Sequence, residues 1–147
     1  MDIEKFNQYL TEISASEVMT KRIQDLCNNI QSLYNQITIN DIFICDIINN
    51  ANKEYTSLWL FTDTYIIECK NFMNKDDIDF ARLNHNICYI NIKKNNYKEL
   101  LQPTDNSNTV INIFLNDSRL SCTFYANGNN CKHAIHLFQK YFTPNMI

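Results

Sequence analysis

Glycine and proline are scarce in this 147-residue chain, which has one glycine and two prolines. A single glycine excludes the glycine-rich loops that bind phosphate and the Gly-x-Ser-x-Gly elbow of serine hydrolases. Asparagine, aspartate and serine must therefore form most turns, and asparagine tolerates the left-handed backbone region better than most residues do. The frequent asparagine, isoleucine and lysine are also typical of an AT-rich genome, such as that of a low-GC bacterium, its phage or a large DNA virus.

Long apolar runs and an excess of positive charge are also missing. The longest apolar runs have about four residues, whereas a membrane-spanning helix needs roughly 18 or more. The formal net charge is −3, so no positive stripe favours nucleic-acid binding. The residues from Met1 to Lys5 lack the basic start and apolar core of a signal peptide. We therefore expect a cytoplasmic protein that has no transmembrane segment and does not bind nucleic acid.

The chain has six cysteines, and no two of them form a Cys-x-x-Cys pair. They are Cys27, Cys45, Cys69, Cys88, Cys122 and Cys131. Most have apolar neighbours, as buried free thiols do. This pattern indicates a reducing compartment and predicts no disulfide framework. We also predict no cofactor.

The apolar residues between positions 2 and 37 recur with a helical period. Ser14, followed by Glu17, matches a capping box and predicts that a second helix begins there and runs to about residue 36. The apolar residues of this helix follow the spacing of a coiled-coil seam; they are Met19, Ile23, Leu26, Ile30, Leu33 and Ile37. This stripe packs against the rest of the domain or forms the seam of a homodimer, and the sequence leaves both possibilities open.

From residue 38 the apolar period changes to two, which predicts β-strands. We expect seven strands, over residues 39–48, 57–61, 65–69, 78–83, 87–92, 110–115 and 120–125. Thr62, Asp63 and Thr64 close a central hairpin, because Asp and Thr form turns with their own side chains. A last helix is expected over residues 130–142. The chain is thus predicted to be one α+β domain, helical over residues 1–37 and a β-barrel with a C-terminal helix over residues 38–147.

Seven antiparallel strands followed by one amphipathic helix resemble the element order of the pleckstrin-homology-like (PH-like) barrel. Residues 60–67, LFTDTYII, are similar to the "LT(D/N)xRLI" hairpin of many bacterial PH-like domains. The chain departs from that pattern at Tyr65, where the family tends to have arginine, and in its N-terminal helices. The resemblance covers about residues 39–142 and implies a seven-stranded antiparallel PH-like barrel or roll capped by the last helix. A β-sandwich or another α+β roll with the same number of strands would give a similar sequence pattern, so the sequence leaves these folds open as alternatives.

The resemblance implies a binding role, with lipid head groups, peptides or other proteins as ligands. The loop over residues 49–54 has one lysine offset by a glutamate, which argues against phosphoinositide binding because such sites use several cations. We therefore predict a non-enzymatic intracellular interaction module whose ligand is a protein. The alternatives are a small phage or viral effector that inhibits a host protein, and a thiol-dependent enzyme that uses Cys131.

Two places in the sequence are candidate sites. Lys93, Lys94, Tyr97 and Lys98 form a basic cluster at the start of the longest polar stretch, where they could bind phosphate or an acidic partner surface. Cys131 is a possible reactive thiol, because the first turn of a helix lowers a thiol pKa. Its place on the apolar face favours a buried structural thiol instead. His133 and His136 lack a second ligand pair, so we predict no metal site.

Overall fold

The computed structural model describes residues 2–35, 37–45, 57–75, 77–82, 87–94, 108–115 and 121–142. The helices are α1 (Ile3–Glu12), α2 (Glu17–Leu33) and α3 (Asn130–Tyr141). One antiparallel sheet has the order β1 (Asp41–Ile44), β2 (Leu58–Phe61), β3 (Tyr65–Lys70) and β4 (Asp77–Arg82), and a second has the order β5 (Ile87–Lys94), β6 (Asn108–Leu115) and β7 (Ser121–Asn127). The predicted α+β class is confirmed. The closed seven-stranded barrel is not confirmed, because no strand pairing joins the two sheets within the described residues.

Both N-terminal helices begin at a side-chain cap. The Asp2 carboxylate accepts the backbone N–H of Lys5, and the Ser16 hydroxyl accepts that of Met19. The prediction that Ser14 caps the second helix is wrong. Ser14 lies in the turn with a left-handed φ of 59°, whereas Ser16 has the extended backbone that an N-cap requires. None of the described helices is long and apolar enough to span a bilayer.

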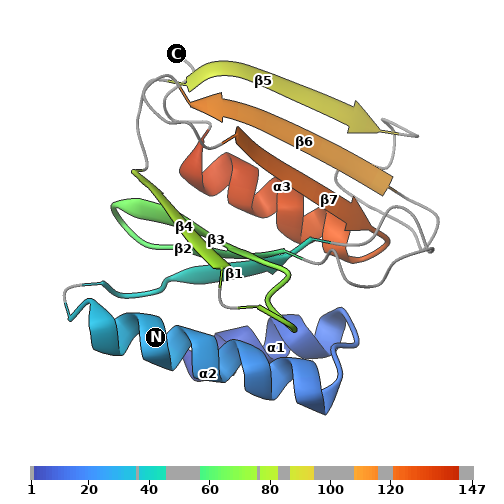
Figure 1. Cartoon of the computed structure of the whole chain (residues 1–147). Coiled ribbons are helices and arrows are strands. Elements are labelled where there is room, and N and C mark those ends of the chain that lie inside the picture. The colour runs from blue at the N-terminus through green and yellow to red at the C-terminus, as the bar shows by residue number, and fades with distance from the viewer. Residues whose placement is uncertain are drawn as a thin grey trace.

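The N-terminal helices lie below the four-stranded sheet in Figure 1 and cover one of its faces. Ile23, Leu26 and Ile30 of α2 are buried in the core. The central part of the stripe that suggested a dimer seam therefore packs within the same chain, whereas Leu33 near its end is 76% exposed. A homodimer through this helix stays a prediction, and it would depend on residues outside the buried part of the stripe.

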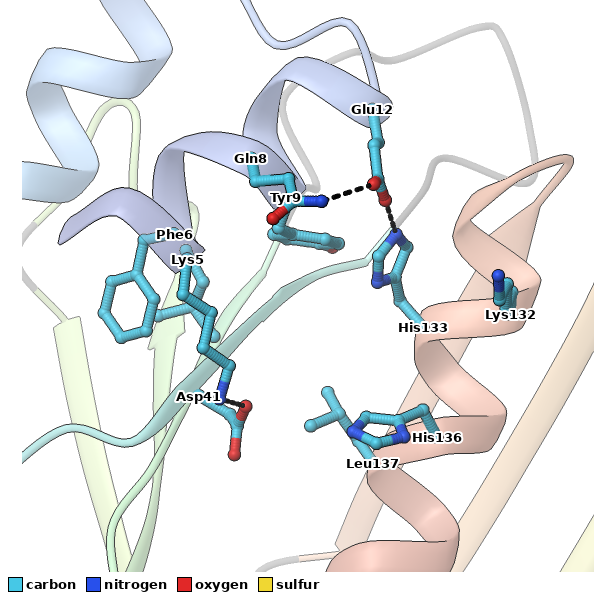
Figure 2. Close-up of a pocket in the computed structure, with 11 residues that line it drawn as sticks. Lys5, Phe6, Gln8, Tyr9, Glu12, Asp41, Lys132, His133, His136 and Leu137 are labelled. Atoms are coloured by element: carbon cyan, nitrogen blue, oxygen red, sulfur yellow. Dashed lines mark hydrogen bonds and ion pairs between the residues drawn. The ribbon is translucent and has the colours of Figure 1, made fainter. Parts of the chain in front are cut away.

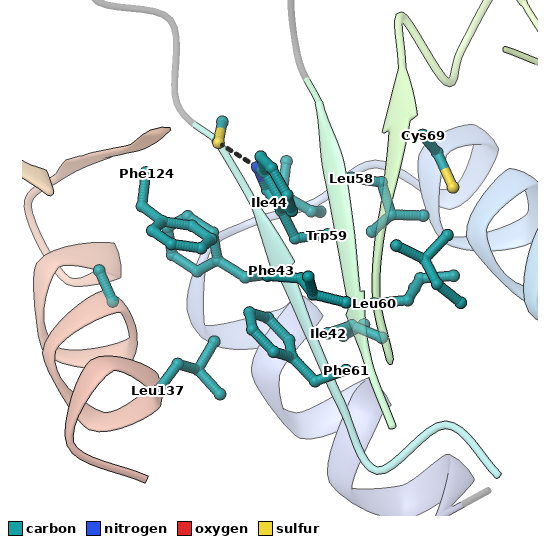
Figure 3. Packing of buried hydrophobic residues seen from close by; sticks show 14 of the residues in the cluster. Ile42, Phe43, Ile44, Leu58, Trp59, Leu60, Phe61, Cys69, Phe124 and Leu137 are labelled. Atoms are coloured by element: carbon teal, nitrogen blue, oxygen red, sulfur yellow. Dashed lines mark hydrogen bonds between the residues drawn. The ribbon is translucent and has the colours of Figure 1, made fainter. Parts of the chain in front are cut away.

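Strand β2 is buried on both faces, as expected for the centre of a sheet that is covered on each side. Its Trp59 and Phe61 rings contact Phe124 of β7. Because side chains alternate along a strand, Leu58 and Leu60 lie on the opposite face, which the N-terminal helices cover (Figure 3). The Thr62 hydroxyl accepts the backbone N–H groups of Thr64 and Tyr65, so the predicted turn closes with its own side chain.

Helix α3 lies against β7 and β6 of the second sheet and against β1 of the first (Figure 1). Asn129 occupies the N-cap position of α3, where asparagine is a favoured residue, but its side chain makes no capping hydrogen bond. Asn130 is the first residue of the helix and is buried. Its side chain points into the protein, where it contributes to the site described next.

Candidate functional site

A cleft of about 330 Å³ opens between α1, β1 and α3 (Figure 2). We call it the α1–α3 cleft. It is lined by Lys5, Phe6, Gln8, Tyr9, Glu12, Asp41, Ile42, Lys132, His133, His136 and Leu137. Phe6, Ile42 and Leu137 are buried and form apolar walls, whereas most of the polar side chains lie at the rim.

A buried hydrogen-bond network fixes the two helices on either side of the cleft. The Tyr9 hydroxyl donates to Oδ1 of Asn130 at 2.8 Å and accepts the backbone N–H of Ile44 at 2.9 Å. Nδ2 of Asn130 donates to the backbone carbonyl of Ile44 at 2.8 Å. Each of the three residues thus bonds to the other two, which ties α1, the end of β1 and the start of α3 to one another.

The Asp41 carboxylate lies at the other end of the cleft and is only 5% exposed. Its oxygens lie 2.5 Å from Nζ of Lys5 and 2.6 Å from Nζ of Lys140, and it also accepts the hydroxyl of Tyr141. Burial raises the pKa of Asp41, but the hydrogen bonds from Lys140, Lys5 and Tyr141 together lower it further, so the net pKa lies below its usual value. Asp41 is therefore ionised at neutral pH and joins α1 to the end of α3.

Replacing Asp41 with asparagine is expected to destabilise the fold at pH 7 by about 1–3 kcal/mol, because three donors lose an ionised acceptor. The cost stays in this range because the two lysines are nearly half exposed, so water screens their charges. Since the pKa of Asp41 is lower in the folded state, its contribution is present above the unfolded pKa and is lost as the pH falls below about 4. Urea unfolding of both proteins at pH 7 and pH 3 measures this difference. The exposed Asp25→Asn change is the control, and a cost that stays the same at pH 3 would contradict the assignment.

A hydrogen bond between a histidine and a carboxylate lies at the rim of the cleft. Nε2 of His133 lies 2.7 Å from the Glu12 carboxylate, and the His133 ring packs edge-on against Tyr9 at 4.5 Å between ring centroids (Figure 2). Burial and the nearby charges of Lys132 and His136 together lower the pKa of His133 by more than Glu12 raises it. The imidazole is therefore largely neutral at pH 7 and donates its N–H to Glu12.

The ionisable groups of the cleft mostly bind one another. Asp41 accepts from two lysines and a tyrosine, and Glu12 accepts from His133 and, at 3.5 Å, from Gln8. Across the described ranges, no group of three or more histidine, cysteine, aspartate or glutamate side chains could hold a metal ion. Lys132 and His136 are exposed at the rim, where a ligand can reach them.

The basic cluster predicted from the sequence is only partly within the described residues. Lys93 and Lys94 end β5, an outer strand of the second sheet, opposite Val110 and Thr109 of β6. Tyr97 and Lys98 lie outside the described residues. Binding through this cluster stays a prediction.

Cys131 lies in the first turn of α3, where the sequence placed it, and is fully buried. Its thiol donates a hydrogen bond to the carbonyl of Ala126 at 3.3 Å. Cys131 does not line the α1–α3 cleft, so it does not act with His133 or His136 there. The other cysteine side chains that the structure describes are also buried thiols: Cys27, Cys45, Cys69 and Cys122.

Cys27 and Cys122 are expected to react with iodoacetamide roughly a thousandfold more slowly in the folded protein at pH 8 than in guanidinium chloride. Burial raises the pKa of each thiol to about 12, so its thiolate is far rarer than that of an unfolded cysteine with a pKa near 8.5. Peptide mapping by mass spectrometry gives the rate at each cysteine. Rates within tenfold of the unfolded values would contradict this burial. In the same experiment, labelling of Cys131 faster than a free thiol would revive the thiol-enzyme alternative.

Sequence reasoning missed most of the cleft, because its residues are far apart along the chain. Tyr9 and Asn130 are separated by 121 positions, and Asp41 and Tyr141 by 100. The apolar residues of the first helix recur at Ile3, Phe6, Leu10 and Ile13, and this spacing leaves out Tyr9. In the structure Ile3 is 53% exposed, whereas Tyr9 is buried. No local spacing signals such a network.

Comparisons of the chain with protein-family models, curated proteins and solved structures find no match. The PH-like resemblance therefore rests on the order of the elements and on the hairpin sequence. The function proposed below rests on the geometry of the cleft.

Proposed function

We propose that this chain is a non-enzymatic protein-binding module of PH-like type, which holds a segment of its partner in the α1–α3 cleft. The observation that carries the proposal is the combination of apolar walls and a polar rim in one concave surface. Phe6, Ile42 and Leu137 supply the walls, and Gln8, Lys132 and other polar residues supply the rim. Protein interfaces combine an apolar centre with a polar rim in the same way.

The order of the elements supports the PH-like assignment. Four antiparallel strands are followed by three more and then by a helix that packs on β7, which is the order that the resemblance implies. The N-terminal helices are a departure from the PH-like pattern. One of them, α1, supplies a wall of the α1–α3 cleft, so this departure would create the binding surface.

The pairing of charges supports binding over catalysis. A catalytic base or nucleophile needs a lone pair that faces the substrate. The Asp41 and Glu12 carboxylates are each engaged by neighbouring donors. These pairs hold the walls of the cleft in place, which preorganises it for a partner.

The test is to capture a partner from a lysate of the source cells, purify it and measure its affinity for cleft variants. Gln8→Trp places a bulky ring at the exposed rim, and Lys21→Trp places the same ring on the exposed side of α2. We expect Gln8→Trp to weaken the dissociation constant at least about tenfold, and Lys21→Trp to leave it within about threefold. Equal affinities for both variants would place binding elsewhere. Failure to capture any protein reproducibly would contradict the protein-binding role.

A further inference from the structure

A second concave surface lies where the end of α2 meets the turn between β2 and β3. Its volume is about 620 Å³, and we call it the tyrosine pocket. It is lined by Tyr34, Asn35, Ile37, Thr38, Thr62, Asp63, Thr64 and Tyr65. It shares no residue with the α1–α3 cleft, so it is a separate site.

Two tyrosines from different elements line the tyrosine pocket, and a phenylalanine from a third element packs against both. Tyr34 follows α2, Tyr65 begins β3, and both line the pocket. Phe80 of β4 contacts both tyrosines, with ring centroids 5.1 Å from Tyr34 and 6.4 Å from Tyr65. The plane of the Phe80 ring is inclined by 59° to that of Tyr34 and by 85° to that of Tyr65, so the three rings do not form one flat stack.

Two of these rings are exposed, and Tyr65 is partly buried. Tyr34 is 48% exposed and Phe80 is 38% exposed, and the neighbouring Leu33 is also exposed. Exposed aromatic side chains that cluster beside a concavity are enriched at protein interfaces and supply much of their binding energy.

The charge of the tyrosine pocket selects the kind of ligand. Asp63 is the one charged residue among those that line it. Its Oδ1 accepts a hydrogen bond from Nδ2 of Asn40 at 2.7 Å, and the Thr62 hydroxyl holds the turn on which it sits. A fixed carboxylate repels anions and attracts cations, and the faces of aromatic rings attract cations as well.

We propose that the tyrosine pocket binds a basic side chain, lysine or arginine, of a partner protein. The cation would lie against the ring faces of Tyr34 and Tyr65 and form an ion pair with Asp63. The net charge of −3 of the chain also favours association with a basic partner. This inference is independent of binding in the α1–α3 cleft, because the two sites have no lining residue in common.

The test uses small probes and the full chain. Nα-acetylarginine amide and Nα-acetyllysine amide are titrated into ¹⁵N-labelled protein in the millimolar range, with backbone amide shifts as the readout. The matched neutral probes are the citrulline and Nε-acetyllysine derivatives. We expect shifts centred on residues 34–35 and 62–65, and at least about tenfold weaker binding of the neutral probes.

Variants show whether the proposed residues are responsible for this binding. Asp63→Asn keeps an oxygen that can accept from Asn40 but removes the charge, and it should weaken binding of the arginine probe about tenfold. Tyr34→Leu should weaken it similarly, and Asp25→Asn on the exposed side of α2 should not change it. Equal binding of the arginine and citrulline probes, shifts that lie elsewhere, or equal losses for Asp63→Asn and Asp25→Asn would overturn the proposal. The probe comparison uses only the unmodified chain, so it holds even if a variant does not fold.

Discussion

Replacing Phe124 with alanine is expected to lower the free energy of unfolding by about 3–5 kcal/mol. The Phe124 side chain is buried, and its ring centroid lies 5.0 Å from that of Trp59, 5.7 Å from Phe43 and 6.1 Å from Phe61 (Figure 3). These contacts join β7 of the second sheet to β1 and β2 of the first. Removing the ring loses them and leaves a cavity between the two sheets.

The neighbouring Tyr125 supplies the control for this substitution. Tyr125 is 37% exposed and, because side chains alternate along a strand, points away from the contacts of Phe124. We expect Tyr125→Ala to cost less than about 1 kcal/mol. Urea unfolding followed by circular dichroism and by the fluorescence of Trp59, the only tryptophan, measures both changes. Equal costs for the two substitutions would show that Phe124 does not join the sheets.

Replacing Asn130 with alanine is expected to cost about 2–4 kcal/mol, the second largest effect. The Asn130 side chain is buried and bonds at 2.8 Å to both the Tyr9 hydroxyl and the carbonyl of Ile44. Alanine removes both bonds and leaves buried polar groups that must find other partners. Urea unfolding at pH 7 measures the loss.

Two further variants separate this network from simple helix capping. Asn129→Ala changes the residue at the N-cap position, which makes no capping bond, so we expect a cost below about 0.5 kcal/mol. Tyr9→Phe removes the other half of the network. The double change Tyr9→Phe with Asn130→Ala should cost less than the sum of the single changes by about 1 kcal/mol or more. A large cost for Asn129→Ala, or full additivity of the pair, would contradict the proposed network.

The local features of the fold could be predicted from the sequence. The change from a helical period to a period of two separates α2 from β1, and the hairpin predicted over residues 57–61 and 65–69 is found as β2 and β3. Thr62 closes its turn with contacts to residues two and three positions away, so neighbouring residues suffice to predict it. The start of α2 could not be predicted in this way, because Ser14 and Ser16 are both suitable N-cap residues. Only the backbone conformation in the fold, extended at Ser16 and left-handed at Ser14, distinguishes them.

The candidate site could not be predicted, because it depends on contacts between distant parts of the chain. Asn130 stands at the start of α3, where an asparagine side chain often caps a helix, yet this side chain bonds to Tyr9 and Ile44. In the sequence Asp41 is one polar residue in a predicted strand. Its role as the shared acceptor of Lys5 and Lys140 depends on the packing of two helices against that strand. The pairing of the strands into two sheets is likewise set by packing and not by local periodicity.

The most direct test of binding in the α1–α3 cleft is site-specific photo-cross-linking in a lysate of the source cells. The cross-linking amino acid p-benzoylphenylalanine is placed at position 8 on α1, at position 136 on α3 and, as a control, at position 21 on α2. Positions 8 and 136 line the cleft, and position 21 does not. Binding in the α1–α3 cleft predicts that the same protein is cross-linked from positions 8 and 136 and not from position 21. Cross-linking from position 21 with equal yield, or from neither position in the cleft, would contradict it.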